Sequence, residues 1–142
     1  MQVKITDNSK IFKDAMGRAS EMILTAIGEE AAGNAMQELT EQDAVDTGRL
    51  RNSITYATKQ HTEAKSFSWQ EGAKSGAPGG SGTTEPKGTP EKDTVYIGTN
   101  VEYAKYIEEG TSRSAARPYL KPAASEHGDE YRKIAENILR NA

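Results

Sequence analysis

The triplet Asp46-Thr47-Gly48 is the stretch of this sequence whose residue types most directly suggest chemistry. The same three residues, in this order, mark the active site of the aspartic proteases, in which two carboxylates about 3 Å apart share one proton. A chain of 142 residues supplies only one such aspartate, so a protease of this kind would have to be a dimer. A dimeric aspartic protease that uses Asp46 is therefore one hypothesis for the chain.

The surroundings of the triplet favour a structural role over catalysis. A protease aspartate lies at the end of a buried apolar strand, whereas the residues before Asp46 read TEQDAV and are mostly polar. Arg49 follows Gly48 directly, and a cation beside a carboxylate pair favours ionisation of both groups over a shared proton. We therefore expect Asp46 to cap the turn or short helix that follows, and Gly48 to supply a permissive backbone position. We do not expect an enzyme.

Nothing else in the sequence indicates a metal or cofactor site. His61 and His127 are far apart, and no ligand-like spacing surrounds either, so both are expected on the surface. The glycines within residues 79–82 follow no strand and precede no Gly-Lys-Ser or Gly-Lys-Thr triplet, so they do not form a phosphate-binding loop. Glu108 and Glu109 are adjacent on an expected helix and face different ways, so they do not form an acid–base pair. We expect no cofactor.

Charge and composition exclude several classes of partner. A net charge of -3 and a pI of about 5.5 provide no basic field for nucleic acid, which disfavours a DNA-binding module. The chain has no cysteine, which excludes disulfides and thiolate metal ligands. The N-terminal residues lack an apolar signal core, and no apolar run approaches the roughly 20 residues of a membrane span. We expect a soluble protein without membrane contact, made in the cytosol.

The spacing of apolar residues predicts the elements that position these groups. Apolar residues at steps of three and four indicate helices, and alternation indicates strands. In chain order the sequence predicts an edge strand (1–6), a long helix (about 9–40) with a break possible at Gly33, a turn or short helix (46–52), two strands (54–62 and 94–99), a helix (101–110) ended by Gly110, and a last helix with Pro122 in its first turn.

The fold class that follows is α+β, a single domain over residues 1–142 in which a long N-terminal helix and a C-terminal helix pack on a small antiparallel sheet. Residues 68–93 consist mostly of Gly, Ser, Thr, Pro and charged residues. Such a segment buries too little apolar surface to offset its ordering entropy, so we expect a long flexible excursion between two strands. Trp69, at its root, is expected either to pack on the sheet or to face a partner.

Two stretches of the chain together resemble one family of proteins. VDTGRLRNSI (45–54) is followed, after a variable insert, by YIGTNVEYAKYIEEGTSRSAARPYLKPA (96–123). This order of motifs resembles the small tail-component family of long-tailed bacteriophages and prophages, also described as head–tail joining or tail-completion proteins. Two positions depart from the pattern, because Glu109 stands where an aromatic or apolar residue is common and Tyr119 stands where Phe is common.

The resemblance implies an α+β subunit of the virion that forms a ring at the neck and is made in the cytoplasm of the bacterial host. Six copies would match the symmetry of the tail. The expected partners are further copies of the chain, the neck connector or stopper proteins, and the tail terminator or tail-tube proteins. Double-stranded DNA would pass through without specific binding, and an acidic pI suits such a channel because Lys and Arg bind phosphates. An assembly factor that does not remain in the virion is the alternative.

The residues that match the family pattern are expected to be mostly structural. They are Asp46, Gly48, Leu50, Arg51, Ile54, Gly98, Tyr103, Ala104, Ile107, Gly110, Thr111, Pro118, Leu120 and Pro122. Among them Leu50, Ile54, Ile107 and Leu120 should fill the core, and Arg51 should pair with Asp46 or with a helix end. Tyr and Arg are enriched where interfaces bury anchors. Our candidates for subunit contacts are therefore Trp69, Tyr103, Arg113, Arg117 and Tyr119.

Overall fold

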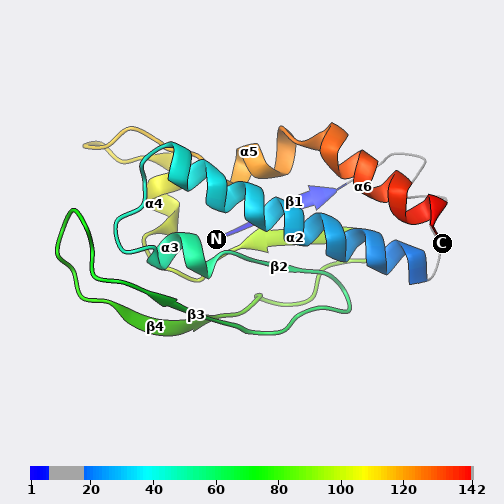
Figure 1. Ribbon diagram of the computed structural model, residues 1–142, viewed down its shortest axis with the longest axis horizontal. Coiled ribbons are helices and arrows are strands. Elements are labelled where there is room, and N and C mark those ends of the chain that lie inside the picture. The colour runs from blue at the N-terminus through cyan, green and yellow to red at the C-terminus, as the bar shows by residue number, and fades with distance from the viewer. Residues whose placement is uncertain (7–17, 142) are drawn as a thin grey trace.

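Strand β5 (Thr94–Gly98) lies at the centre of the main sheet. Its sequence, TVYIG, places buried side chains on both faces, as a central strand requires. It pairs antiparallel with β1 (Gln2–Thr6) on one side and with β2 (Thr55–Ala57) on the other. The computed structural model describes residues 1–6 and 18–141 (Figure 1). The α+β class and the predicted strands at 1–6 and 94–99 are confirmed.

Helix α2 (Arg18–Glu41) crosses one face of this sheet (Figure 1). Its most deeply buried side chains recur at every fourth residue; they are Ile23, Ile27, Ala31, Ala35 and Leu39, all at most 2% exposed. Gly28 faces β2, where an added Cβ would come within 2.5 Å of the Tyr56 ring, so glycine permits the close approach of helix and strand. The helix continues through Gly33 without a break, and residues 9–17 of the predicted helix lie outside the described residues.

Two helices, rather than one, form the C-terminal end of the described chain. They are α5 (Leu120–Ser125), with Pro122 in its first turn as predicted, and α6 (Gly128–Arg140). The amide of Glu126 closes α5 on the Pro122 carbonyl at 2.8 Å. The hydroxyl of Tyr131 in α6 donates to the Ala123 carbonyl, so α6 turns back over the end of α5 and packs beside α2.

Strand β2 is shorter than the predicted 54–62. The backbone groups of Thr58 and His61 bond to each other in both directions, which closes a turn directly after Ala57. The buried hydroxyl of Thr58 donates to the carboxylate of Glu21 on α2 and holds the turn against the helix. The strand prediction was therefore wrong beyond Ala57, because a polar contact with α2 turns the chain there.

The excursion at 68–93 lies between β2 and β5 as predicted, but part of it forms a second antiparallel sheet. Its strands are β3 (Lys65–Trp69) and β4 (Gly80–Thr84). The Phe67 and Trp69 rings lie 5.6 Å apart on β3, and their register partners on β4 are Gly82 and Gly80. A Cβ at Gly80 would come within 2.8 Å of the Trp69 ring, so the glycines make room for the aromatic rings. The segment therefore has an apolar contact that its composition conceals.

Two short helices lie at the end of the molecule opposite the C-terminus (Figure 1). They are α3 (Arg49–Ser53), which follows the Asp-Thr-Gly triplet, and α4 (Ala104–Glu109), which follows β5. The loop of the β3–β4 hairpin extends past the same end (Figure 1). We call this region the motif end, because α3, α4 and the loops beside them contain most of the residues of both sequence motifs.

Candidate functional site

Gly48 and Thr47 determine how the chain enters α3. Gly48 has a φ of 85°, in the region that favours glycine, and no side chain caps the helix. The Thr47 hydroxyl accepts a hydrogen bond from the Arg49 amide at 3.1 Å. Leu50 then points into the core and is 4% exposed. The permissive role of Gly48 is confirmed, whereas the predicted cap by Asp46 is wrong.

Asp46 instead holds the tip of the β3–β4 hairpin. Its Oδ1 accepts hydrogen bonds from the amides of Lys74 at 2.6 Å and Ser75 at 3.2 Å, and its Oδ2 accepts one from the Ser75 hydroxyl. A side chain at Gly72 would overlap the carboxylate, so glycine is required for this approach. The bond from the Ser75 hydroxyl, followed by that from the Lys74 amide, holds the pKa of Asp46 below its ordinary value.

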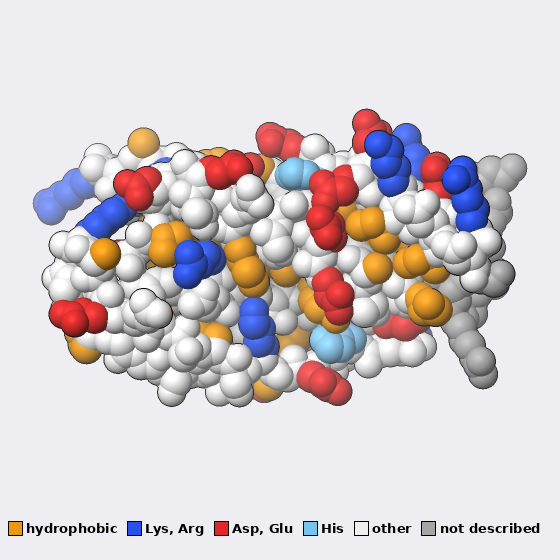
Figure 2. Space-filling model, viewed as in Figure 1, with side chains coloured by type: hydrophobic (Ala, Val, Ile, Leu, Met, Phe, Trp, Pro, Cys, Tyr) orange, Lys and Arg blue, Asp and Glu red, His pale blue; other side chains and the backbone are white. Residues whose placement is uncertain are grey.

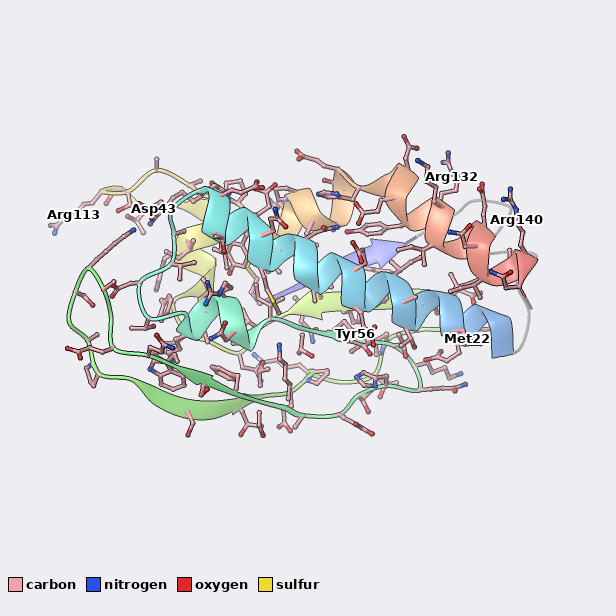
Figure 3. All side chains as sticks on the ribbon, in the orientation of Figure 1. Met22, Asp43, Tyr56, Arg113, Arg132 and Arg140 are labelled. Atoms are coloured by element: carbon pink, nitrogen blue, oxygen red, sulfur yellow. The ribbon has the colours of Figure 1, made fainter. Side chains whose placement is uncertain are left out.

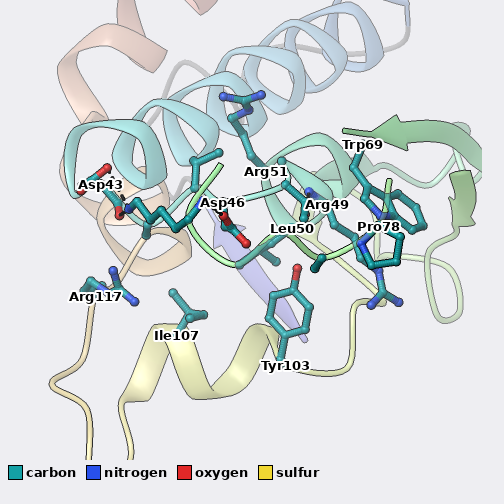
Figure 4. Close-up of a pocket in the computed structure, with 16 residues that line it drawn as sticks. Asp43, Asp46, Arg49, Leu50, Arg51, Trp69, Pro78, Tyr103, Ile107 and Arg117 are labelled. Carbon is teal, nitrogen blue, oxygen red and sulfur yellow. Dashed lines mark hydrogen bonds and ion pairs between the residues drawn. The ribbon is translucent and has the colours of Figure 1, made fainter. Parts of the chain in front are cut away.

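Arg49 connects α3 to the hairpin and to α4. Its guanidinium carbon lies 5.2 Å from the centroid of the Trp69 ring and 5.7 Å from that of Tyr103. Its two terminal nitrogens donate to the two carboxylate oxygens of Glu102, both at 3.0 Å. The Arg49 side chain therefore contacts groups from two other segments, β3 and the residues just before α4, and Figure 4 shows it near Trp69 and Tyr103. Arg51 does not pair with Asp46 as expected, because its Nε donates to Asn52 at 3.1 Å.

Glu108 is a structural residue of the motif end that sequence reasoning missed. It is 3% exposed, and its Oε1 accepts hydrogen bonds from the amides of Tyr119 at 3.2 Å and Leu120 at 2.7 Å, where α5 begins. A carboxylate at a helix N-terminus binds amides that have no partner within the helix. The partners lie 11 and 12 residues away, so no local spacing indicates them, and Glu109 beside it is exposed.

Gly110 and Thr111 shape the loop between α4 and α5. Gly110 ends α4 with a φ of 78°, as predicted, and an added Cβ would lie 2.7 Å from the Ala116 amide nitrogen. The Thr111 hydroxyl accepts bonds from the amides of Arg113 at 3.2 Å and Ser114 at 3.1 Å. These bonds produce a tight exposed turn with Arg113 at its tip, which lies at one extremity of the molecule (Figure 3).

These contacts surround an open groove of about 480 Å³ at the motif end (Figure 4). The groove brings together residues from both motifs and three of the candidate contact residues, of which Tyr103 belongs to both sets. Its lining includes Asp46, Gly48, Leu50, Arg51, Tyr103 and Ile107 from the motifs, with Trp69 and Arg117. Burial raises the pKa of the Tyr103 hydroxyl, which points into the groove (Figure 4).

The remaining motif residues lie outside the groove and support it. Ile54, Ala104 and Leu120 are in the core and at most 1% exposed. Pro118 offers its carbonyl to the Gln42 side chain at 2.7 Å, which ties the loop to the end of α2. A side chain at Gly98 would overlap the backbone of Met1, so glycine permits the pairing with β1.

Tyr119 is buried inside its own subunit, whereas a residue that contacts another subunit has to be exposed. Its side chain is 0% exposed, and its hydroxyl donates to the Ala104 carbonyl at 3.0 Å. Burial raises the pKa of this hydroxyl well above the ordinary value. The expectation that Tyr119 forms a contact between subunits is therefore corrected, because the residue belongs to the core of its own subunit.

The environment of Asp46 differs from that of an aspartic-protease carboxylate. The lowered pKa of Asp46 and its three donors from the hairpin describe an ionised anchor, which is the opposite of a carboxylate that shares a proton. Among residues 1–6 and 18–141, no three His, Asp or Glu side chains are placed to hold a metal ion. No helix within the described ranges has the length and apolarity needed to cross a membrane. The His61 ring stacks on the Tyr56 ring with 4.6 Å between the ring centroids, and the Nδ1 atom of His127 shares a hydrogen bond with the Glu130 carboxylate.

Comparison with known proteins gives one match. A family model described as "Bacteriophage HK97-gp10, putative tail-component" matches residues 4–110. The matched range spans about three quarters of the chain and includes the Asp46 motif, the β3–β4 hairpin, β5 and α4. No curated protein and no solved structure matches the chain. The chain therefore belongs to the HK97 gp10-like family of bacteriophage tail components.

Proposed function

We propose that this tail component forms a ring at the head–tail interface, where it completes or joins the tail and leaves a passage for DNA. The family supports a structural role in the phage tail. The proposed neighbours are the connector or stopper proteins on the head side and the terminator or tube proteins on the tail side. A ring of six copies would match the symmetry of a tail.

The observation that supports the proposal is that residues of the two motifs fix the backbone of exposed segments. Asp46 holds the hairpin tip, Glu108 holds the start of α5, and Thr111 holds the exposed turn around Arg113. Each contact fixes the path of a backbone segment at the motif end. A protein that works through the shape of an exposed surface needs such contacts, whereas an enzyme needs reactive groups that face a substrate.

The charge of the chain agrees with a passage for DNA. At a net charge of -3, a ring of copies would carry no overall attraction for phosphate, so DNA could slide through without being retained. Lys or Arg residues added to the passage would bind the DNA phosphates, and this binding would strengthen as the salt concentration falls.

The test is removal of the gene from a phage that carries it, followed by electron microscopy of the lysate. We expect full heads and complete tails that are not joined, and restoration of infectious particles by the intact gene supplied in trans. An epitope inserted at the exposed Lys87-Gly88 bend should then label purified virions at the neck. Absence of the protein from purified virions would favour the assembly factor, and label at the distal tail would contradict the proposed location.

A further inference from the structure

The charges of this chain are separated along the sequence. Residues 19–48 contain seven acidic residues and no Lys or Arg, and most of them lie on α2. Residues 110–121 contain three basic residues and no Asp or Glu, and they form the loop after α4 and the start of α5. Because the net charge is only -3, such blocks point to local interactions rather than to an overall field.

The outer face of α2 is acidic and uncovered in the described chain. Met22 is 60% exposed, and Glu29, Glu30, Gly33 and Gln37 are exposed on the same side of the helix. Figure 2 shows a column of acidic side chains across the middle of the side of the molecule on which α2 lies, with Lys and Arg side chains to either side of it. Met22 and Glu30 lie about 12 Å apart along the helix axis. We call these five residues the α2 face.

Glu30 of the α2 face lies beside a second carboxylate. It shares a hydrogen bond with Glu130 of α6, and this bond raises the pKa of Glu30 while it lowers that of Glu130. Two neighbouring carboxylates cannot both ionise without repulsion. A cation supplied by another copy would favour the ionised form of both carboxylates. Besides Glu30, Glu130 bonds to Asn34 and His127.

The loop after α4 offers such cations. Arg113 is exposed at the tip, and neither Arg113 nor Arg117 forms an ion pair with any described residue. Tyr106, on α4 just before the loop, is 60% exposed. By contrast, Arg132 near the other end is already paired with Asp129 at 3.6 Å. We call Tyr106, Arg113 and Arg117 the loop face.

We propose that the loop face of one copy binds the α2 face of the next copy, with Arg113 and Arg117 on Glu29 and Glu30. This inference rests on the proposed ring and names its subunit contact. The two faces are different surfaces of one molecule, and Figure 3 places Arg113 and Met22 toward opposite ends of its long axis. Contacts between unlike surfaces repeat in one direction and close into a ring when the rotation permits. Tyr106 and Met22 supply the exposed apolar area on the two sides.

Two charge-reversed variants test the contact. One carries Arg113→Glu and Arg117→Glu, and therefore presents an acidic loop face to an acidic α2 face. The other carries Glu29→Lys and Glu30→Lys, and presents a basic loop face to a basic α2 face. Each variant alone should associate at least about a hundredfold more weakly than the unchanged protein, because like charges then meet at the interface.

A mixture of the two variants should restore association. The acidic loop face then meets the basic α2 face, and the unchanged loop face of the second variant meets the unchanged α2 face of the first. Rings with alternating variants satisfy every contact when the number of copies is even. The mass of the assembled protein, measured at low salt, reports whether rings form. If rings form only in the particle, both variants are expressed together in phage that lack the gene, and the yield of infectious particles is measured. Thermal unfolding checks that each variant is folded.

The control reverses two exposed lysines outside both faces, Lys59→Glu and Lys92→Glu, which gives the same change in net charge as the loop variant. This control should assemble like the unchanged protein. Normal assembly by either charge-reversed variant alone, or failure of the folded mixture to assemble, would overturn the contact. Either result leaves the neck location intact, whereas joined particles in the absence of the gene would overturn the proposed function itself.

Discussion

The part of the molecule around β5 and the motif end are held together by different kinds of contact. Around β5, apolar side chains such as Val95, Ile97 and Ile27 pack against one another, and the stabilisation is shared among many of them. At the motif end, single carboxylates bind backbone amides of distant segments, Asp46 at the hairpin tip and Glu108 at the start of α5. The first arrangement determines how stable the fold is, and the second determines the outline of the exposed surface. Substitutions in the two regions should therefore have different consequences.

The largest effect is expected from the core. Ile97→Ala removes a side chain that is 0% exposed in the central strand, and should lower the free energy of unfolding by about 2–5 kcal/mol. Urea denaturation measures the change. Met22→Ala, at a residue that is 60% exposed, is the matched control and should leave the unfolding midpoint close to that of the unchanged protein. Equal losses from both variants would contradict the assignment of the core.

Glu108→Ala should be the most destabilising change at the motif end. It removes two hydrogen bonds to a charged acceptor, which contribute about 1.5–3 kcal/mol each, although the buried Oε2 has no partner among the described residues and reduces the net gain. We expect a loss of about 2–3 kcal/mol by chemical denaturation. Glu109→Ala at the exposed neighbour is the control, and a similar loss there would show that α5 does not depend on the buried carboxylate.

Gly110→Ala should have a smaller effect on stability and a clear effect on shape. A φ of 78° with a ψ of 177° is a conformation nearly confined to glycine, and forcing another residue into it costs about 1–3 kcal/mol. The added Cβ also meets the Ala116 amide, so the loop face should move. Association of copies should weaken together with stability. Gly128→Ala, where nothing lies within 4 Å of an added Cβ, should be tolerated.

The smallest effect on stability, and the most local, is expected when Asp46 loses its charge. Because its folded pKa is lowered, its contribution is present above the ordinary carboxyl pKa near 4 and is lost as the pH falls through the lower folded value. The protection of the Lys74 and Ser75 amides, expressed relative to the intrinsic exchange rate at each pH, should fall over that range, while β5 stays protected. Asp46→Asn should show the fast exchange at neutral pH, and Asp43→Asn, which keeps the Asp46 contacts, should not. Uniform acceleration in β5 would refute a local role.

The contrast between the two regions also explains what could be predicted from sequence. The spacing of apolar residues identified α2 and β5, because burial on one face or on both leaves a periodic pattern. The hairpin was missed because its apolar contact comes from Phe67 and Trp69 lying against glycines, which an average over composition does not reveal. The partners of Asp46 lie 28 and 29 residues away, and a local cap was the expectation for an aspartate before a helix.

The groove was predictable only in part. The resemblance to the tail-component family singled out six motif residues that line it, but their convergence depends on the β3–β4 hairpin and on the loop after α4. Glu108 gave no signal, because its partners follow an exposed loop. Tyr119 was assigned to the surface because tyrosine is common at interfaces, yet its hydroxyl finds a carbonyl acceptor inside the subunit.

The bonds between Asp46 and the hairpin tip have a consequence for sequence divergence. Two of the three donors are main-chain amides, and an acceptor that binds main-chain amides is indifferent to the side chains beside them. Most side chains of the tip could therefore differ between related phages, and the binding preference of the tip could differ with them. Asp46 and Gly72 would still hold the backbone of the tip in place. One short segment can then combine a surface whose sequence changes quickly with a backbone position that does not change.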